Sequence, residues 1–289
     1  MRIKGNSLQQ IRLFFDEELA ALYELAEILV LFRLAVQQIN GFSHMEIHLN
    51  PERRVSESEL LEYSRFVKKL KQGVPVQYIM GYTWFLDLKI GVNPSVLIPR
   101  PETEELVHNL IPFLNAHPYA RILDACTGSG CIALALKQMF PHTQVLGIDS
   151  SAEAIQTART NAVLLDLDVD FQQRDVFASF HGEAKFDLIV SNPPYIPQDE
   201  FSELSIQVRD FEPHTALFVP DSDAFLFYRR LNKLALSLLN KGGLLAFECH
   251  YKGCDAVAKL LDDDGFESVG IHTDLSGNQR FVLGTLEML

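Results

Sequence analysis

Apolar residues recur at helical spacing through the first quarter of the chain. Ser7 is a candidate helix N-cap, and the apolar positions after it lie three and four residues apart, as on one face of an amphipathic helix. A second run of this kind begins after Ser56 or Ser58 and ends at Gly73-Val74-Pro75, where glycine and proline break a helix. We therefore predict a helical domain over residues 1–72.

The pattern changes after this helical region. From Tyr78 to Val92, aromatic, glycine and β-branched residues alternate, which is typical of a β-hairpin. We predict that residues 73–96 form a hairpin linker and that residues 97–289 form a second domain.

Strand-length apolar runs and amphipathic helical stretches alternate through this second domain. The predicted strands are 121–124, 144–149, 169–174, 186–191, 244–249, 268–272 and 280–283. The predicted helices are 131–139, 152–165, 223–239 and 254–264. This alternation predicts an α/β fold with a doubly wound, mostly parallel sheet. Because residues 274–278 are too few for a crossover helix, we expect the last two strands to pair antiparallel.

The negative charge is concentrated in the second domain. Residues 1–90 contain 11 Lys and Arg and 11 Asp and Glu, whereas residues 91–289 contain 14 and 27, which accounts for the net charge of −13. Contacts to a nucleic-acid backbone require clustered cations. We therefore expect no stable nucleic-acid partner. One basic cluster lies in the predicted helical domain and comprises Arg65, Lys68, Lys69 and Lys71. We interpret it as a solvated helix face.

Neither a membrane span nor a secretion signal is predicted. The most apolar stretch, Ala20 to Val36, carries Glu24, Glu27 and Arg33, and so fits a core helix better than a span. The first seven residues lack the apolar segment of a signal peptide. We expect a cytoplasmic protein without a membrane partner.

The four cysteines are interpreted as packing residues. Cys126, Cys131, Cys249 and Cys254 lack the C-x₂-C spacing of a zinc site, and a reducing compartment disfavours disulfides. We therefore predict neither a metal site nor a disulfide.

The most informative motif is Asn192-Pro193-Pro194-Tyr195, which follows the apolar run 186–191. The two prolines make a stiff corner, Asn192 adds a carbonyl acceptor and an NH₂ donor, and Tyr195 adds a flat aromatic face. These groups suit the capture of a planar amino or amide group whose N–H bonds need acceptors. We predict that all four residues form a catalytic loop, and it resembles the loop of methyltransferases that alkylate amide or exocyclic amino nitrogens.

A cofactor site is predicted at the ends of the first two strands of the sheet. Asp124 and Asp149 end these strands, the first positioned to accept from a ligand ammonium group and the second to hold both hydroxyls of a ribose. Glycines between them allow close approach of the backbone. The residues expected to contact the cofactor in this turn are Cys126, Thr127, Gly128, Ser129 and Gly130. By themselves these features fit NAD as well as S-adenosyl-L-methionine.

Three further observations refine this site. Cys126 occupies the place of the usual first glycine, which disfavours a pyrophosphate and predicts a backbone angle there that does not require glycine. After the third strand, Asp175 is expected to bind the amino group of an adenine, and Val176 or Phe177 to line the edge of its ring. Asn192 is expected to face both cofactor and acceptor, and together with the catalytic loop these features favour S-adenosyl-L-methionine.

With these motifs established, the chain closely resembles the PrmC/HemK family of protein-glutamine methyltransferases from about residue 73 to its end. The segments that carry the resemblance follow in family order and are Pro75–Gly81, Leu97–Glu104, Asp124–Cys131, Asp149–Ser150, Ser191–Ile196, Phe211–Leu217 and Asp274–Gly277 with Arg280. Leu97–Glu104 is the most distinctive of them. Residues 1–72 match the family in helical character alone.

The resemblance implies the class I S-adenosyl-L-methionine-dependent methyltransferase fold, a Rossmann-like sheet that ends in an antiparallel hairpin. It also implies S-adenosyl-L-methionine as cofactor and class 1 peptide chain release factors as partners. In that family the enzyme methylates the side-chain amide of the glutamine in the Gly-Gly-Gln motif. The helical domain would then dock the substrate, and we expect a helix capped near Thr103 and an Arg100 that pairs with a carboxylate.

Two other functions remain open. An adenine-N6 or other nucleic-acid amino-methyltransferase would use the same loop, but it would need a basic surface and a way to extract a base. A non-catalytic binding module would retain the fold as a scaffold. Methyl transfer to a release factor or to DNA separates these possibilities.

Overall fold

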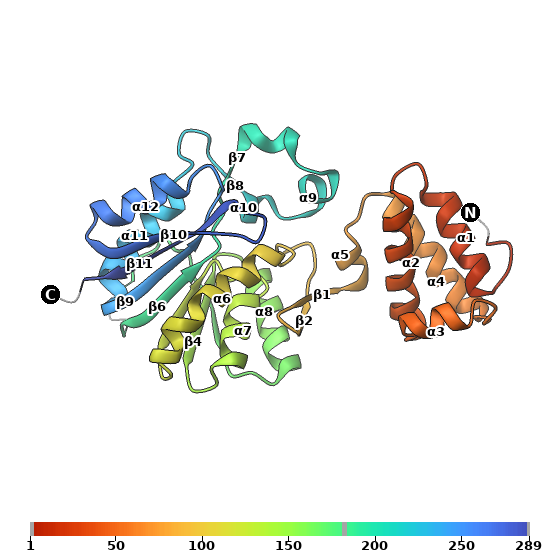
Figure 1. The fold of residues 1–289 in the computed structure, drawn as a ribbon, viewed down its shortest axis with the longest axis horizontal. Helices are drawn as coiled ribbons and strands as arrows, with labels where there is room; N and C mark the ends of the chain where they lie inside the picture. Colours follow the sequence, from red (N-terminus) through yellow and green to blue (C-terminus); the bar gives the residue numbers. More distant parts are fainter. Residues whose placement is uncertain (1–2, 181–183, 288–289) are drawn as a thin grey trace. The chain divides into compact units, whose positions relative to one another are not determined.

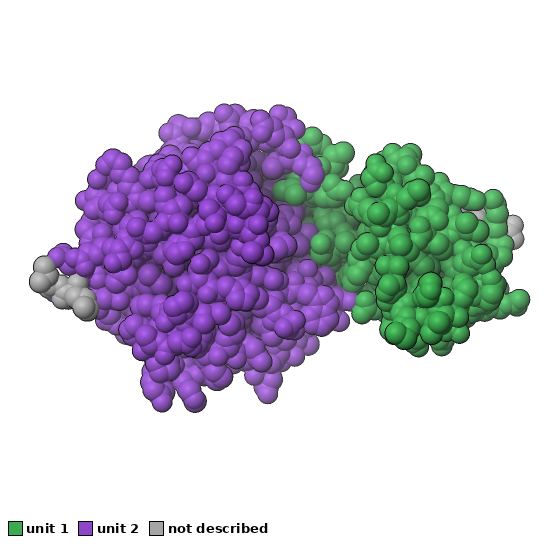
Figure 2. All heavy atoms as spheres, viewed as in Figure 1, with its two compact units in different colours: residues 1–81, 206–211 green, residues 82–205, 212–289 purple. Residues whose placement is uncertain are grey.

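The computed structural model describes residues 3–180 and 184–287, and these form two compact units. The first unit extends to Gly81 and includes the later segment Ile206–Phe211. The second comprises Tyr82–Ser205 and the chain from Glu212 onward. Figure 2 distinguishes the two units by colour.

The first unit is built of short amphipathic helices around one aromatic core. Its helices are α1 (Leu8–Leu19), α2 (Leu25–Asn40), α3 (His44–Leu49), α4 (Glu57–Lys71), α5 (Val76–Met80) and α9 (Ile206–Phe211). Ser7, Ser43 and Ser56 each form a capping box with a Gln or Glu three residues later, so α1, α3 and α4 begin where their sequences satisfy free N–H groups. Phe15 and Tyr63 lie at the centre and are fully buried.

The expected hairpin is present but shorter than predicted. Strands β1 (Tyr82–Phe85) and β2 (Leu88–Gly91) pair antiparallel. The prediction that the hairpin begins at Tyr78 is wrong, because Val76–Met80 forms helix α5 and ends at Gly81, whose φ of +80° favours glycine.

The second unit contains the predicted sheet. Its order is β10-β11-β9-β6-β3-β4-β5; β11 runs antiparallel to both of its neighbours, and the pairs from β9 to β5 are parallel. The strands are β3 (Arg121–Ala125), β4 (Gln144–Asp149), β5 (Asp170–Gln173), β6 (Phe186–Ser191), β9 (Leu239–Glu248), β10 (Phe266–Thr273) and β11 (Gln279–Leu286). The antiparallel pairing of the last two strands is therefore confirmed.

Helices cover both faces of this sheet. They are α6 (Pro101–Ala116), α7 (Cys131–Met139), α8 (Ala152–Leu165), α11 (Leu226–Leu238) and α12 (Cys254–Asp263). Figure 1 shows α6, α7 and α8 on one side of the sheet and α11 and α12 on the other. Since both faces are covered, the central strands are nearly continuous apolar runs, and Phe186, Ile189 and Leu245 are fully buried.

Short elements after β6 complete the second unit. They are β7 (Ile196–Pro197), η1 (Gln198–Glu203), α10 (His214–Leu217) and β8 (Phe218–Val219), with β7 and β8 paired in parallel. Within residues 3–180 and 184–287, no helix is long and apolar enough to cross a membrane.

Candidate active site

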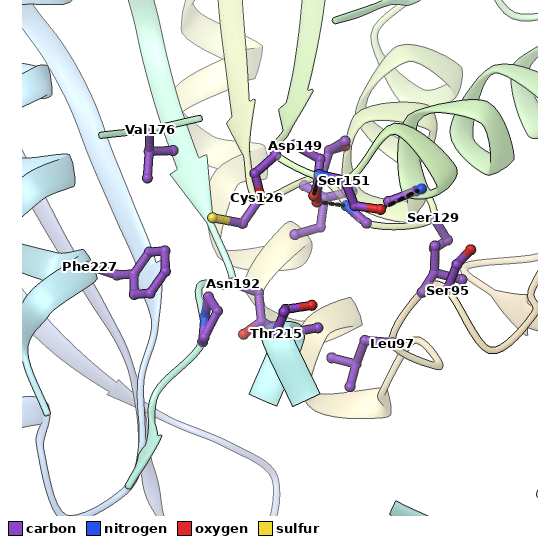
Figure 3. A pocket seen from close by; sticks show the side chains of 18 of the residues that line it. Ser95, Leu97, Cys126, Ser129, Asp149, Ser151, Val176, Asn192, Thr215 and Phe227 are labelled. Atoms are coloured by element: carbon purple, nitrogen blue, oxygen red, sulfur yellow. Dashed lines mark hydrogen bonds between the residues drawn. The ribbon is translucent and has the colours of Figure 1, made fainter. Parts of the chain in front are cut away.

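A cavity of about 360 Å³ lies in the second unit where the parallel strands end. Crevices at the carboxyl ends of parallel strands are the usual ligand sites of open α/β sheets. The cavity is lined by the turn after β3, the tips of β4 and β5, the loop after β6, and the segments before α6 and around α10. Figure 3 shows Cys126, Asp149, Val176 and Asn192 around it.

Asp149 stands at the tip of β4 and lines this cavity. Its Oδ2 accepts from the backbone N–H of Gly128 at 3.0 Å, and its Oδ1 accepts from the N–H of Ser151 at 2.9 Å. Burial raises the pKa of Asp149, while these backbone hydrogen bonds oppose the rise. Each carboxylate oxygen retains further acceptor capacity, so the side chain can still receive two hydroxyl donors.

The turn after β3 lines the cavity through Cys126, Thr127, Gly128 and Ser129. The expectation that the backbone angle at Cys126 would not be one that suits glycine is wrong, because its φ is +61°, in the left-handed region that favours glycine. The N–H of Thr127 donates to the Ile148 carbonyl at 2.9 Å, which ties the turn to β4 directly after the strained residue.

Gly130 supports the turn without lining the cavity. Its φ is +81°, and an added Cβ would lie 2.8 Å from the Phe171 ring, so both conformation and space require glycine there.

Asp124 is placed beneath the turn rather than on the cavity wall. Its side chain is fully buried, and Oδ2 accepts from the Thr127 hydroxyl at 2.5 Å and from the Ala133 N–H at 3.2 Å. Burial raises the pKa of Asp124 to about 7, against these two hydrogen bonds. Among the described residues, Asp124 Oδ1 and Ser129 Oγ are buried polar atoms without a hydrogen-bond partner.

The end of β5 supplies a polar and an apolar group to the cavity. Asp175 is exposed, and its Oδ1 accepts from the Phe177 N–H at 2.9 Å. Val176 is 4% exposed, and Phe227 on α11 lines the cavity near it. Phe177 packs edge-on against Phe227, with ring centroids 5.2 Å apart. A flat apolar slot with a carboxylate at its rim results.

The catalytic loop predicted at 192–195 turns directly from the tip of β6. Asn192 and Pro194 line the cavity, whereas Pro193 and Tyr195 do not. Ser191, the last strand residue, donates its hydroxyl to the Ala125 carbonyl at 2.6 Å and so joins this loop to the glycine turn. The Asn192 side chain therefore lies on the same cavity as Asp149, from a neighbouring region of the sheet edge.

A chain of hydrogen bonds connects both ends of this loop to the buried Glu248, at the end of β9. Asn192 Nδ2 donates to Thr103 Oγ1 at 3.2 Å, and Thr103 Oγ1 donates to Glu248 Oε2 at 2.7 Å. The Tyr195 hydroxyl donates to Glu248 Oε1 at 3.2 Å. The sequence analysis gave Glu248 no role, because its partners lie 53 and 145 residues away along the chain.

The segment before α6 closes one wall of the cavity. The expected pairing of Arg100 is confirmed, because its guanidinium forms an ion pair with Glu212. Glu212 Oε2 also accepts from the Ile98 N–H at 3.1 Å. The expected cap near Thr103 is wrong: α6 begins after Arg100 with Pro101 in its first turn, and the Thr103 hydroxyl is used on Glu248 instead.

Two sequence families match this chain. The PrmC N-terminal domain family matches residues 15–81, and the methyltransferase small domain family matches residues 106–209. A methyltransferase from Pyrococcus furiosus has a similar fold, with a TM-score of 0.51 and 18% identity over 70% of this chain and 90% of the other. At this identity the likeness concerns the fold.

Curated relatives are similar over nearly the whole length. A release factor glutamine methyltransferase from Flavobacterium psychrophilum is 37% identical, covering 95% of this chain and 98% of the relative. One from Bacteroides thetaiotaomicron is 35% identical, covering 95% and 99%. Both family matches and these full-length relatives agree with the fold and with the resemblance of the motifs. The chain therefore belongs to the release factor glutamine methyltransferase family.

Proposed function

We propose that this chain transfers a methyl group from S-adenosyl-L-methionine to the side-chain amide nitrogen of the glutamine in the Gly-Gly-Gln motif of class 1 peptide chain release factors. The observation that carries the proposal is that Asn192 and Asp149 line one cavity, in a chain of this family. Asn192, which would accept an amide N–H, and Asp149, which would bind the ribose hydroxyls, thus face the same cavity.

The residues of the cavity fit the cofactor in size and polarity. A volume of about 360 Å³ is in the range of small-molecule sites. Asp149 would hold the ribose hydroxyls, and Asp175 the amino group of an adenine whose ring lies in the slot by Val176. Bound S-adenosyl-L-methionine supplies an electrophilic methyl carbon.

Asn192 and Pro193 would orient the acceptor nitrogen. An amide nitrogen is a poor nucleophile because its lone pair is delocalised into the carbonyl. Asn192 donates through Nδ2 to Thr103, so its Oδ1 is the end that accepts one substrate N–H, and the Pro193 carbonyl accepts the other. Two fixed acceptors hold the nitrogen with its lone pair toward the methyl carbon, so positioning and preorganised dipoles supply most of the rate.

Tyr195 would support the loop rather than act as a base. Burial raises the pKa of its hydroxyl. The hydroxyl therefore stays protonated near neutral pH, and no phenolate is available to act as a base. The amide proton becomes acidic after methyl transfer, and water can take it.

The helical first unit would bind a part of the release factor other than the glutamine that is methylated. A glutamine side chain offers little binding area, so remote contacts must supply affinity and orientation. The unit has its own aromatic core, and its surface carries a cavity of about 240 Å³ lined by leucines and basic side chains. Because the proposed partner acts in translation, we propose that the reaction occurs in the cytoplasm.

Labelled methyl transfer tests the proposed function directly. Purified release factor, the same factor with its Gly-Gly-Gln glutamine changed to alanine, duplex DNA and single-stranded DNA are offered as acceptors. We expect label in the unchanged factor and loss of transfer in Asn192→Ala. Transfer to DNA, or equal transfer to the factor without its glutamine, would exclude the proposed substrate.

A further inference from the structure

Glu248 is a buried carboxylate that the proposed chemistry has not used. It ends β9 and is 2% exposed. Its backbone carbonyl accepts from the Tyr228 hydroxyl at 3.1 Å, which fixes the strand end from the α11 side. Its two carboxylate oxygens accept from different hydroxyls, those of Thr103 and Tyr195.

Three neighbours of Glu248 stabilise the ionised form of its carboxyl. Burial, and to a smaller extent the Glu102 charge, raise the pKa of its carboxyl, while the Thr103 hydroxyl, the Arg280 charge and the Tyr195 hydroxyl oppose that rise. Arg280 is held in turn by Asp274 at 3.4 Å. A carboxylate that receives two hydroxyl donors beside a guanidinium has the partners that a buried charge requires.

In the series of hydrogen bonds from Asn192 through Thr103 to Glu248, the number of protons on each group determines which group donates. An ionised carboxylate only accepts, so Thr103 must use its single hydroxyl proton on Glu248. Toward Asn192, Thr103 can then only accept, and the end of Asn192 that lies 3.2 Å away must be its NH₂ group. The carbonyl oxygen of Asn192 is thereby turned away from Thr103.

We infer that Glu248, through Thr103, is a positioning residue that sets the orientation of the Asn192 amide, and that through Tyr195 it holds the other end of the same loop. This inference rests on the proposed function, in which Asn192 Oδ1 accepts an N–H of the substrate. With the amide turned over, an NH₂ group would face the N–H donors of the substrate. Two donors facing one another leave both unpaired, so the reaction would lose an acceptor at the nitrogen.

Thr103→Val is the sharpest test, because it removes the hydroxyl and keeps the shape of the side chain. We expect kcat to fall about 10- to 100-fold, as for a lost preorganised group, with the cofactor Kd and the release-factor KM within about threefold of wild type. Thr103→Ser restores the hydroxyl and should recover most of the lost kcat. Rescue by serine would not follow if Thr103 acted through packing alone.

Thr143→Val is the matched control. The Thr143 hydroxyl is also buried and donates to the Phe140 carbonyl at 2.7 Å, before β4 and outside the cavity lining. It reports the effect of losing a buried hydroxyl elsewhere, and its kcat should stay near that of wild type. In every variant kcat is expressed per cofactor-binding site counted by calorimetry, so that misfolded protein does not enter the comparison.

A double-mutant cycle assigns the effect to Glu248. Glu248→Met removes both acceptor oxygens at similar volume, and it should lower kcat at least as much as Thr103→Val. If the two residues act in one chain, adding Thr103→Val to Glu248→Met should cost little more. Independent, multiplying effects would overturn the inference, as would a Thr103→Val enzyme with kcat within threefold of wild type. Failure of the proposed function is a different result, since wild type itself would then transfer no methyl group to the release factor.

Discussion

At the scale of single residues, the candidate site depends on carboxylates that differ in what they contact. Asp149 faces the cavity with acceptor capacity to spare, Asp124 is sealed beneath the turn, and Glu248 ends a hydrogen-bond chain. All three have a raised pKa, and in each case burial is the main cause. The three carboxyl groups therefore have similar pKa shifts but different roles. A variant of Asp149 should change cofactor affinity, whereas a variant of Asp124 should change the pH dependence of stability.

Asp149→Ala should weaken cofactor binding. Loss of a charge-assisted hydrogen bond to a ribose costs about 2 kcal/mol, or roughly 30-fold in Kd. Titration calorimetry with S-adenosyl-L-methionine measures this directly. Asp168→Ala, at an exposed aspartate outside the cavity lining, is the control and should bind normally. An unchanged Kd in a folded Asp149→Ala protein would remove Asp149 from the site.

Asp124→Asn should change how stability depends on pH. The pKa of Asp124 in the folded protein, about 7, lies above the ordinary value of 3.8, so folding favours the protonated form. The stability that this gives is fully present below pH about 4 and is lost as the pH rises through 7, in total on the order of 4 kcal/mol. The amide in this variant does not titrate. The free energy of unfolding, measured with urea, should therefore fall less between pH about 4 and 7 than it does in wild type. Parallel pH profiles for the two proteins would contradict the burial argument.

At the scale of elements, strand tips and close packing bring the site together. Gly147 in β4 lies against Phe171 of β5, and an added Cβ would stand 2.5 Å from that ring and 2.9 Å from Thr127 Oγ1. The Phe171 ring is 1% exposed and also packs on Gly130. One aromatic side chain thus requires two glycines, one in the strand and one in the cofactor turn.

Gly147→Ala should therefore destabilise the second unit by roughly 1–3 kcal/mol, as overpacking does in a closed core. Urea unfolding measures the loss. Phe171→Leu makes room for the new methyl group, so the double variant should lose less stability than the sum of the two single changes. Additive losses would show that the contact between these two residues does not set the spacing of β4 and β5.

Elements with a strong period were predictable from the sequence. The helices Cys131–Met139 and Ala152–Leu165 and the strand Phe186–Ser191 have the predicted ends, because apolar periodicity and turn residues agree there. Helix α5 was missed, since five residues give too short a pattern to separate helix from strand. The Thr103 hydroxyl was read as a local cap because its partner, Glu248, is distant along the chain and no local pattern indicates it.

The candidate site was predictable to a similar degree. Strand-end residues such as Asp149 and Asn192 could be assigned to one cavity because parallel strands share an edge. The backbone angle of Cys126 could not be predicted, because the hydrogen bond from Thr127 to Ile148 that accompanies it joins residues distant in the sequence. Asp124 illustrates the same limit: its position at a strand end was clear, but its burial depends on how α7 covers it.

At the scale of the whole molecule, the chain forms two units. The second unit contains the candidate active-site cavity, and the first has a hydrophobic core of its own. The first unit carries a groove lined by Leu13 and Leu29 beside Arg33, His44 and His48. Apolar side chains flanked by basic ones suit a partner segment that is apolar and acidic. Ile206–Phe211 belongs to this unit, and Tyr23 forms a hydrogen bond with the Gln207 side chain, so removal of residues 1–72 would take away part of the packing of that segment. Point substitutions in the groove are therefore a cleaner test of docking than truncation.

Leu13→Asp should raise KM for a folded release factor about tenfold, the effect of losing roughly 1.4 kcal/mol at a contact, with kcat unchanged. The cofactor Kd should not move, and neither should methylation of a short Gly-Gly-Gln peptide, because the peptide lacks the part of the factor that we expect to bind the groove. Leu61→Asp is the matched control, since Leu61 is 52% exposed against 54% for Leu13 and lies outside the groove. If both substitutions leave kcat/KM for the folded factor unchanged, this groove does not dock it. If both raise KM equally, the charge introduced on the unit, rather than the groove, is responsible. A rise confined to Leu13→Asp and to the folded factor would assign recognition to the helical unit and leave the chemistry to the other.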